Sequence, residues 1–271
     1  MKTVDLLYRN GWVGWLRDLA NAGGTGGLNW HVHAARSLQR WLPTRELIAQ
    51  FLAQVQPTSS NLVLIGCSAG WMLPTPWLAR FKHIDVYDID PLVPFLFGLR
   101  HARTLRAQGV TVNYHRSDAI AGLPRLLQQH PNASLWFDNV LGQLGFRLGD
   151  EDMAERQLRQ LKTMLKGREW GSLHDVYSGP VDPLLDLPVY ESMQWTRLDD
   201  LPEEQAQVSL NKLKMPHADA AQALLGKLNA TGVWHDHSTQ EVFEKGTLTA
   251  MLPWAFKPRY WHWLQAAWVK P

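Results

Sequence analysis

The sequence predicts an α/β fold, a doubly wound, mostly parallel sheet of seven strands with helices on both faces. Three observations predict it. The run Asn61-Leu-Val-Leu-Ile65 is apolar and bounded by turn residues, which suits a strand buried on both faces. Strand-like and helix-like segments alternate from residue 61 to residue 138 with short connections, which is typical of right-handed βαβ crossovers. The end of the chain carries two further strand-like segments that predict an antiparallel hairpin.

The order of elements follows from hydrophobic periodicity and from turn residues. Residues 1–57 are expected to form an N-terminal helical cap, with helices at 4–20 and up to residue 56, and residues 58–271 are expected to form the α/β domain. In that domain we expect strands at 61–66, 84–88, 110–115, 133–138 and 169–176 and helices near 71–81, 92–107, 120–129 and 151–166. The last helix is amphipathic, because its apolar residues Met153, Leu158, Leu161 and Leu165 recur at helical spacing.

The segment 180–232 interrupts this alternation. It has four prolines between Pro180 and Pro202 and a helical stretch at 218–228. An insertion after the fifth strand lies near the carboxyl ends of the strands, where open α/β sheets bind ligands, so we expect part of a substrate lid here. Strands at 247–252 and 260–269, around a turn at 253–258, are expected to close the sheet as the C-terminal hairpin.

Composition favours an enzyme with one main domain and excludes several other classes. A chain of 271 residues with 45% apolar content can bury a large core. With 27 basic and 25 acidic residues, the formal net charge is only +2, which predicts no extended basic surface for nucleic acid or for an anionic membrane. The single cysteine, Cys67, excludes an internal disulfide framework. Residues 1–10 lack a signal-peptide core and no apolar stretch is long enough to cross a bilayer, so a cytoplasmic location is expected.

The segments 61–70 and 84–91 together predict a nucleoside-binding half. Gly66 and Gly70 follow the first strand, and without a Cβ each can take a positive φ and leave room for a nucleotide against the main chain. Asp88 follows at the distance that one βαβ crossover requires, at the tip of the second strand. An acid in that position accepts hydrogen bonds from ribose hydroxyls, and the intervening helix is expected to direct its free N–H groups toward the ligand.

At these residues the chain resembles the class I S-adenosylmethionine-dependent methyltransferases, which have a Rossmann-like fold. The first motif of the family is a strand followed by a glycine-rich turn, here Gly66-Cys67-Ser68-Ala69-Gly70. The resemblance covers roughly residues 60–175 and implies S-adenosylmethionine as cofactor. The cofactor-binding residues that it implies are Gly66, Cys67, Ser68, Gly70, Asp88, Ile89, Asp118, Ala119 and Asn139. Among them, Asp88 is expected at the ribose, Asp118 at the adenine, and Asn139 at the inner edge of the pocket.

Two positions depart from the family pattern. The usual acid near the end of the first strand is Leu64, and the central glycine of the turn is Ser68. The first departure removes the usual indirect contact to the methionine amino group, and the second narrows the pocket mildly, since serine is small and tolerates a turn. Two alternatives therefore stay open. One is a non-catalytic binding or scaffold protein on a degenerate methyltransferase fold, and the other is a different nucleotide-dependent transferase or oxidoreductase.

Histidine and aspartate pairs are the candidates for a catalytic base. His174 and Asp175 fall near the end of the fifth strand, where either can orient or deprotonate an acceptor. His235 and His237 alternate on one strand face, but no cysteine pair and no helical His-x-x-x-His accompanies them, so we predict no metal site. His31 and His33 are expected in surface or capping roles. Methyl transfer also proceeds without any base, because the sulfonium is already activated.

The acceptor is the least determined feature of the sequence. No motif for base amino groups and no basic, aromatic-interleaved strip for nucleic acid is present. A small-molecule acceptor is our first expectation, and a protein side chain is the second. Tryptophans near both ends of the chain either line an acceptor pocket or, as we favour, fill the core. They are Trp12, Trp15, Trp30, Trp41, Trp254, Trp261, Trp263 and Trp268.

Overall fold

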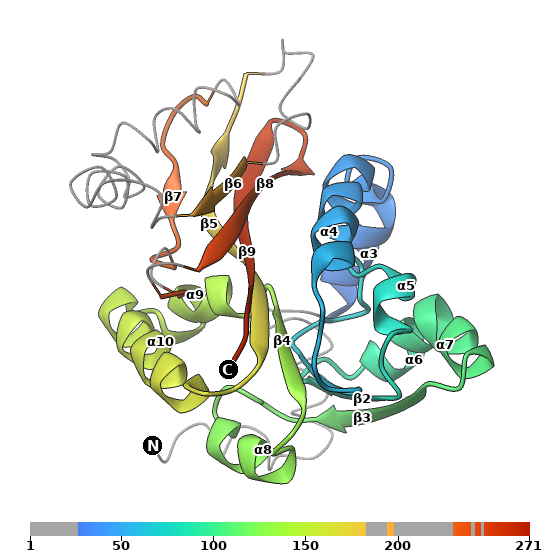
Figure 1. The fold of residues 1–271 in the computed structure, drawn as a ribbon. Helices are drawn as coiled ribbons and strands as arrows, with labels where there is room; N and C mark the ends of the chain where they lie inside the picture. The colour runs from blue at the N-terminus through green and yellow to red at the C-terminus, as the bar shows by residue number, and fades with distance from the viewer. Residues whose placement is uncertain (1–26, 183–193, 198–229, 240–241, 245–246) are drawn as a thin grey trace.

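The computed structural model describes residues 27–182, 194–197, 230–239, 242–244 and 247–271. A sheet of nine strands runs through them in the order β3-β2-β1-β4-β5-β9-β8-β6, with β7 paired to β5 (Figure 1). The parallel strands are β1 (Asn61–Ile65), β2 (His83–Asp88), β3 (Thr111–Arg116), β4 (Ser134–Asp138) and β5 (Trp170–Pro180). The antiparallel part consists of β6 (Gln194–Arg197), β7 (His235–Asp236), β8 (Leu248–Lys257) and β9 (Tyr260–Val269).

The strand order places a ligand crevice between β1 and β4. The chain runs outward from β1 through β2 to β3, and it then returns to the other side of β1 to form β4 and β5. Where the order reverses, the loops after β1 and β4 diverge to opposite faces and leave room at the carboxyl ends of the strands. The sheet therefore predicts the location of a ligand before any side chain is considered.

The predicted fold class is confirmed, with additions at the antiparallel side. The hairpin of β8 and β9 closes the sheet as expected, but its connection is only Pro258-Arg259, with Arg259 at φ 59°. β5 extends to Pro180. Two strands beyond the expected seven, β6 and β7, were not predicted, because four and two residues are too few to carry a periodicity.

The helices are short except for three. They are α3 (Gly27–Ser37), α4 (Leu42–Gln54), α5 (Thr75–Leu78), α6 (Val93–Phe97), the π-helical turn Gly98–Ala102, α7 (Arg103–Ala107), α8 (Leu123–Gln129), the 3₁₀ turn Leu141–Gln143, α9 (Leu144–Leu148) and α10 (Glu151–Leu165). None of these described helices has the length and apolar character that crossing a bilayer needs. The predicted helices at 4–20 and 218–228, and most of the predicted lid, lie outside the described residues.

The predicted helix at 71–81 is wrong over most of its range. α5 has four residues and begins only at Thr75. Pro74 disfavours helical backbone at the residue before it, and Pro76 has no N–H to donate. The segment after Gly70 is therefore a series of turns, and the first helix does not direct its N–H groups at the glycine turn as we expected.

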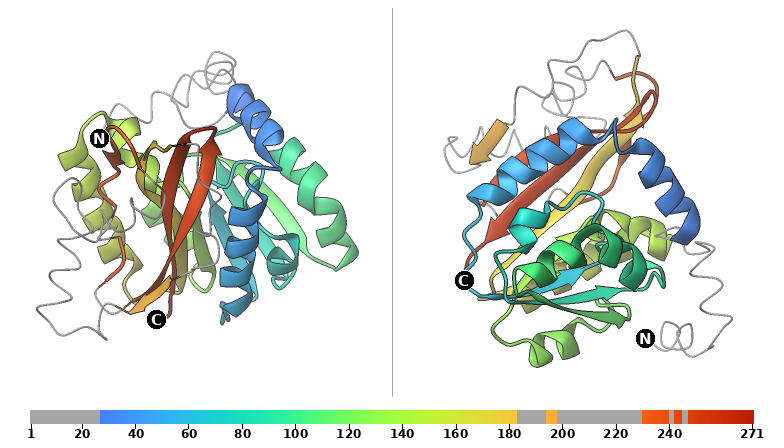
Figure 2. Two further views of the ribbon diagram at one scale, coloured as in Figure 1. Left: turned by 90° about the horizontal axis from the view of Figure 1, so that it is seen from above. Right: turned by 90° about the vertical axis from the view of Figure 1, so that its right-hand side faces the viewer.

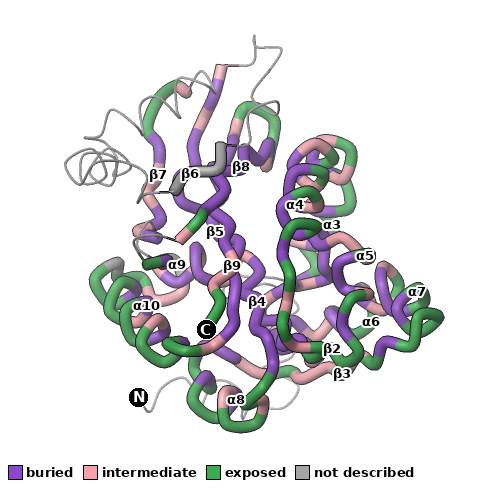
Figure 3. The backbone as a smooth tube through the Cα atoms, in the orientation of Figure 1, coloured by how far each residue is buried: buried purple, intermediate pink, exposed green. Residues whose placement is uncertain are grey.

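Helices cover both faces of the sheet (Figure 2). Along β1 the side chains alternate between two cores, because successive residues of a strand point to opposite faces. Leu62 and Leu64 pack in the core that includes α4, whereas Val63 and Ile65 pack in the core that includes α8 and α10. All four side chains are buried, and buried backbone continues through β4 and β5 (Figure 3).

The described tryptophans mostly fill the core, as we favoured. Trp41, the N-cap residue of α4, is fully buried, packs edge-on against Trp254 of β8 at 5.0 Å between ring centroids, and donates from Nε1 to the Phe256 carbonyl. Trp261 and Trp263 are also buried. Trp30 and Trp268 are partly buried, and Trp12 and Trp15 lie outside the described residues. The aromatic contacts join α4 to the antiparallel hairpin.

Candidate functional site

The turn after β1 requires its two glycines. Gly66, Ser68 and Gly70 have φ values of 68°, 53° and 63°, in the left-handed region. A Cβ on Gly66 would lie 2.7 Å from Cβ of Val140, and a Cβ on Gly70 would lie 2.6 Å from Nε2 of His101. The turn is thus packed against the loop after β4 on one side and against the helical segment after β2 on the other.

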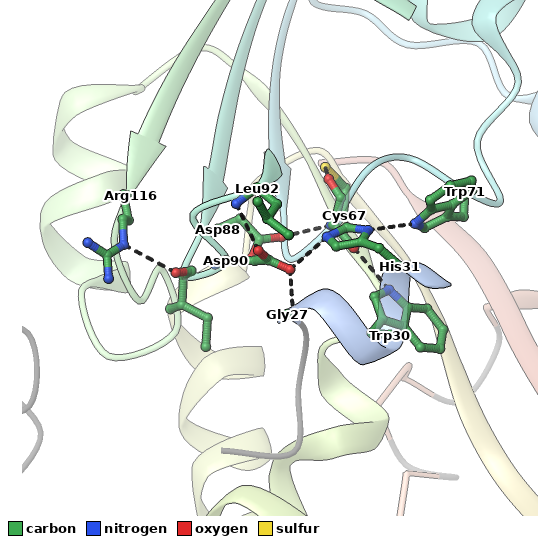
Figure 4. Close-up of polar contacts among 11 residues, drawn as sticks. Gly27, Trp30, His31, Cys67, Trp71, Asp88, Asp90, Leu92 and Arg116 are labelled. Atoms are coloured by element: carbon green, nitrogen blue, oxygen red, sulfur yellow. Dashed lines mark hydrogen bonds and ion pairs between the residues drawn. The ribbon is translucent and has the colours of Figure 1, made fainter. Parts of the chain in front are cut away.

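Asp88 ties this turn to the tip of β2. Its Oδ2 accepts a hydrogen bond from the Ser68 backbone N–H at 2.7 Å, and its Oδ1 accepts one from the Asp90 N–H at 2.9 Å (Figure 4). Burial raises the pKa of Asp88 to about 6, against the opposing effect of those two hydrogen bonds. The carboxylate is therefore oriented by backbone donors and is ionised above that pH.

A second acid fixes α3 above the turn. Asp90 accepts hydrogen bonds from the Gly27 N–H at 2.7 Å and from Nε2 of His31 at 2.9 Å. Trp71 Nε1 can only donate, and it lies 3.0 Å from Nδ1 of His31, so His31 carries its proton on Nε2 (Figure 4). The expected surface or capping role of His31 is therefore wrong, since the imidazole is buried and bonded at both nitrogens. Periodicity could not reveal this, because the partners lie 40 and 59 positions away.

Trp30 covers the turn from the same helix. Its Nε1 donates to Oγ of Ser68 at 2.9 Å, and its ring lies 6.2 Å from that of Phe256. The serine that replaces the family's central glycine thus has a specific partner in this chain. The substitution is compensated locally, because the Ser68 side chain points to Trp30 while its N–H is held by Asp88.

A cleft opens next to Asp88 at the crevice between β1 and β4. Its empty volume, including the part open to solvent, is about 380 Å³. Four residues predicted to bind a cofactor line it, namely Gly66, Asp88, Ile89 and Asp118. Five lining residues were not predicted, namely Tyr87, Ser117, Val140, Gln143 and Arg147. The other predicted residues, Cys67, Ser68, Gly70, Ala119 and Asn139, are not part of this lining.

Asp118 is held in position at the far end of the cleft. Its Oδ1 accepts hydrogen bonds from the N–H groups of Ile120 and Ala121, and its Oδ2 forms an ion pair with Arg147 of α9. Arg147 was missed because the short helical segments at 141–148 have no periodic signal of their own.

Two titratable side chains are buried here, Cys67 within the turn and Asp138 at the end of β4. Burial raises the pKa of the Cys67 thiol well above its usual value, and the charges of Asp88 and Asp138 add to the effect. The thiol stays protonated, which agrees with a packing role. Burial also raises the pKa of Asp138 to about 7, with a further contribution from the charge of Asp88.

A second polar cluster begins at Asn139, which follows β4 with φ 57°. Oδ1 of Asn139 accepts a hydrogen bond from the Asp175 N–H at 3.2 Å. Asp175, on β5, is buried and lies 2.8 Å from Nδ1 of His262 on β9. Asn139 thus connects the loop that lines the cleft to the carboxyl half of β5.

His174 lies in the core, away from this pair. It is fully buried, and its Nδ1 and Nε2 lie 2.9 Å from Ser172 Oγ and 3.2 Å from Gln265 Oε1. Burial lowers the pKa of His174 to about 4, so the imidazole is neutral. Adjacent residues of a strand point to opposite faces, and His174 and Asp175 are therefore not brought together.

His237 joins the cluster from the other side. Its Nδ1 donates to the Gly142 carbonyl at 3.0 Å, and its Nε2 accepts from Ser178 Oγ at 3.0 Å. One ligand-type atom from each of Asp175, His237 and His262 lies within 4.8 Å of the others. The pair considered from the sequence, His235 with His237, is instead a ring contact with centroids 4.8 Å apart.

The chain is similar in structure to several solved proteins. No protein-family model matches the sequence, and neither does any curated protein. A proposed O-methyltransferase of Nostoc punctiforme PCC 73102 is 14% identical with a TM-score of 0.37, and the match covers 84% of this chain and 56% of that one. The chain therefore spans only about half the length of that protein.

Two other similar structures cover more of their own chains. The N-methyltransferase NodS of Bradyrhizobium japonicum WM9, in complex with S-adenosyl-L-homocysteine, is 13% identical with a TM-score of 0.37, over 87% of this chain and 98% of that one. The [4+2]-cyclase SpnF is 14% identical with a TM-score of 0.34, over 84% of this chain and 79% of that one. At these values the likeness carries no functional conclusion. A function must be argued from the strand order and the site.

Proposed function

We propose that the protein is an S-adenosylmethionine-dependent methyltransferase that acts on a small-molecule acceptor by in-line transfer. One observation carries the proposal. The glycine turn after β1 and the acid at the tip of β2 meet at a cleft where the strand order reverses. A nucleoside cofactor needs that combination of close backbone approach and a ribose acceptor. The antiparallel closing hairpin is what the resemblance to class I methyltransferases implies for the same sheet.

The residues of the cleft fit such a cofactor. The ribose hydroxyls would donate to Asp88, whose carboxylate is already oriented by the Ser68 and Asp90 N–H groups. The Gly66 backbone can approach the ligand closely, since this position has no side chain. Ile89 and Val140 would contact the adenine faces, and the adenine amine would share Asp118 with Arg147. Leu64 is fully buried, so an indirect contact to the methionine amino group must come from elsewhere.

When bound, the cofactor supplies an activated methyl group on a sulfonium. The protein then contributes mainly by positioning and by excluding water, which account for much of the acceleration in such displacements. Trp30 and α3 are placed to do both, because Trp30 bonds to the turn and His31 anchors the helix through Asp90. The adjacent half of the carboxyl edge, at β4 and β5, is left for the acceptor.

The test is a calorimetric titration with S-adenosylhomocysteine and S-adenosylmethionine. We compare the wild type with Asp88→Asn and with a matched control on the same strand, Asp85→Asn, whose carboxylate bonds to His115 and Asn113 outside the cleft. We expect saturable binding, weakened roughly 10- to 100-fold in Asp88→Asn, as for a lost hydrogen bond to a charged group, and nearly unchanged in the control.

Other results of the titration would support one of the two alternative functions. Binding of NADH by the wild type without affinity for either sulfur ligand would favour an oxidoreductase. A folded wild type that binds none of the three would favour a scaffold on a degenerate fold. Equal binding by Asp88→Asn and the wild type would remove Asp88 from the ribose site.

A further inference from the structure

We propose that Asp175 and His262 form a base dyad that removes the proton from a small aromatic hydroxyl acceptor. The proposal rests on the proposed function and specifies its acceptor. His262 Nδ1 lies 2.8 Å from Asp175 Oδ1, and both side chains are buried. Burial raises the pKa of Asp175, but the charge and the hydrogen bond of His262 outweigh it and the net shift is downward. An ionised Asp175 can only accept, so Nδ1 of His262 donates, and in the neutral imidazole Nε2 then carries the lone pair.

That lone pair is the buried polar group that needs a partner. Nε2 of His262 is shielded from solvent and has no hydrogen-bond partner among the residues that the structure describes. Buried polar atoms are nearly always paired, and those left unpaired are candidates for functional contacts. In contrast, both nitrogens of His174 and of His237 are engaged. Of the imidazoles of His174, His237 and His262, that of His262 is therefore the one with a nitrogen that no described group binds.

A metal ion is the competing interpretation of the same cluster, since two histidines and a carboxylate are common ligands. The hydrogen-bond pattern argues against it. Tyr260 OH lies 3.2 Å from Ser178 Oγ, which lies 3.0 Å from His237 Nε2, so a chain of donors ends at the His237 lone pair. With the other His237 nitrogen donating to Gly142, this imidazole has no lone pair left for a metal.

The loop after β4 connects the dyad to the cleft. Asn139 links the Asp175 N–H to the loop whose next residue, Val140, lines the cleft and touches the glycine turn. Aromatic rings surround the imidazole: Trp254, Phe256 and Tyr260 lie 5.1, 4.8 and 5.6 Å from it between centroids. Such surroundings favour a planar aromatic acceptor. The described titratable groups that face His262 are Asp175 from β5, Tyr260 from its own strand, and His237, which follows β7.

The need for a base indicates that the acceptor carries a hydroxyl group. A neutral amine attacks with its own lone pair, and a thiol is partly ionised near neutral pH, whereas a hydroxyl must lose its proton as it attacks. In the proposed step the acceptor proton moves to His262 Nε2 and the oxygen forms a bond to the methyl carbon. The carbon–sulfur bond breaks with its electron pair remaining on sulfur. The products are a methyl ether, a neutral thioether and an imidazolium that Asp175 stabilises until it releases the proton to water.

The first test is independent of turnover. Nitrogen-15 NMR of the histidines in the whole protein, with S-adenosylhomocysteine, should show His262 as the Nδ1–H tautomer, with its Nδ1 proton signal lost or shifted in Asp175→Asn. An Nε2–H tautomer would overturn the dyad. Stoichiometric zinc that shifts the His262 signals would overturn it in favour of a metal site.

The second test compares acceptors at pH 9. The probes are phenol, which keeps its proton, and 4-nitrophenol, which has already lost it. We expect His262→Gln to lower kcat about 100-fold or more for phenol and less than tenfold for 4-nitrophenol, with KM changed little, because only phenol needs the base. The matched control is His235→Gln, which should methylate both probes as the wild type does.

Each remaining outcome decides the matter. Equal losses for both probes would give His262 a structural role and overturn the base assignment. A wild type that binds S-adenosylhomocysteine but methylates neither probe would overturn the aromatic hydroxyl. A wild type that does not bind it would refute the proposed function, while the NMR tautomer would still report on the dyad.

Discussion

Asp138 is the most strongly perturbed carboxyl near the site. It lies buried at the end of β4, and its described partner is Trp136 Nε1 at the long distance of 3.4 Å. Burial raises its pKa to about 7, whereas an aspartate in an unfolded chain titrates near 3.9. Between about pH 4 and pH 7 the folded state therefore binds a proton that the unfolded state has released. Its contribution to stability is present below pH 4 and is lost as the pH rises through 7.

We therefore expect Asp138→Asn to stabilise the protein at alkaline pH. At pH 8 the wild type must keep a buried carboxylate, and the variant avoids this cost, which is up to about 4 kcal/mol at 1.36 kcal/mol per pKa unit. The amide oxygen can still accept from Trp136. Urea unfolding at pH 4 and pH 8 measures the difference, which should be small at pH 4. A variant no more stable than the wild type at pH 8 would contradict the assignment.

Among the elements, β5 has a polar anchor just before it begins. The carboxylate of Glu169 accepts hydrogen bonds from the Thr58 N–H and Oγ1, from Ser134 Oγ on β4 and from Trp268 Nε1 on β9. Burial raises the pKa of Glu169, but these bonds outweigh it and the net shift is downward. Its stabilising effect is therefore present above the unfolded pKa of about 4.3 and is lost as the pH falls through the lower folded pKa.

We expect Glu169→Gln to lower the free energy of unfolding by about 2 to 4 kcal/mol at pH 7, because several bonds to a charged acceptor are lost or weakened at once. The loss should shrink toward pH 3. Glu155→Gln on α10 is the matched control, since that carboxylate is exposed and pairs with the exposed Arg159 one turn along the helix, so a change within about 0.5 kcal/mol is expected. Equal effects of the two substitutions on the free energy of unfolding in urea would show that the hydrogen bonds of Glu169 do not stabilise the fold.

The same elements show what local sequence determines. Strands β1 to β5 were predicted because short strand-like segments alternate with helix-like segments between turn residues, and α10 because its apolar residues recur at helical spacing. α5 was overestimated because Pro74 at the N-cap and Pro76 in the first turn prevent a helix from running through residues 71–74. The segments at 141–148 were missed, since one or two helical turns carry no period, and Arg147 was missed with them.

At the scale of the whole molecule, the contacts that the sequence predicted follow from the order of neighbouring strands, and the contacts that it missed join segments far apart in the chain. Gly66, Asp88 and Asp118 lie at the ends of consecutive strands, so their common location in the cleft follows from strand order alone. His262 and Asp175 are 87 positions apart, and Trp30 and Ser68 are 38 apart. Such contacts depend on how the hairpin and α3 pack on the parallel sheet, which no local pattern specifies.

This packing bears on how residues 1–57, predicted from the sequence to be an N-terminal helical cap, unfold relative to the sheet. Side chains of α4, including Ile48 and Leu52, share one core with Leu62 of β1 and Leu252 of β8. In addition, Thr44 Oγ1 donates to the Pro253 carbonyl. A cap that shares its core with the sheet should unfold together with it.

We therefore expect one thermal transition, with coincident far-UV and near-UV circular dichroism. S-adenosylhomocysteine at 100 times its Kd should stabilise the folded state by about 2.7 kcal/mol, because it binds only that state. In a chain of this size, such a stabilisation raises Tm by several degrees. The near-UV signal should show the same rise in Tm as the far-UV signal, because the rings of Trp41 and Trp254 join α4 to β8. Two transitions, the first insensitive to the ligand, would show that the cap unfolds independently of the sheet that holds the cleft.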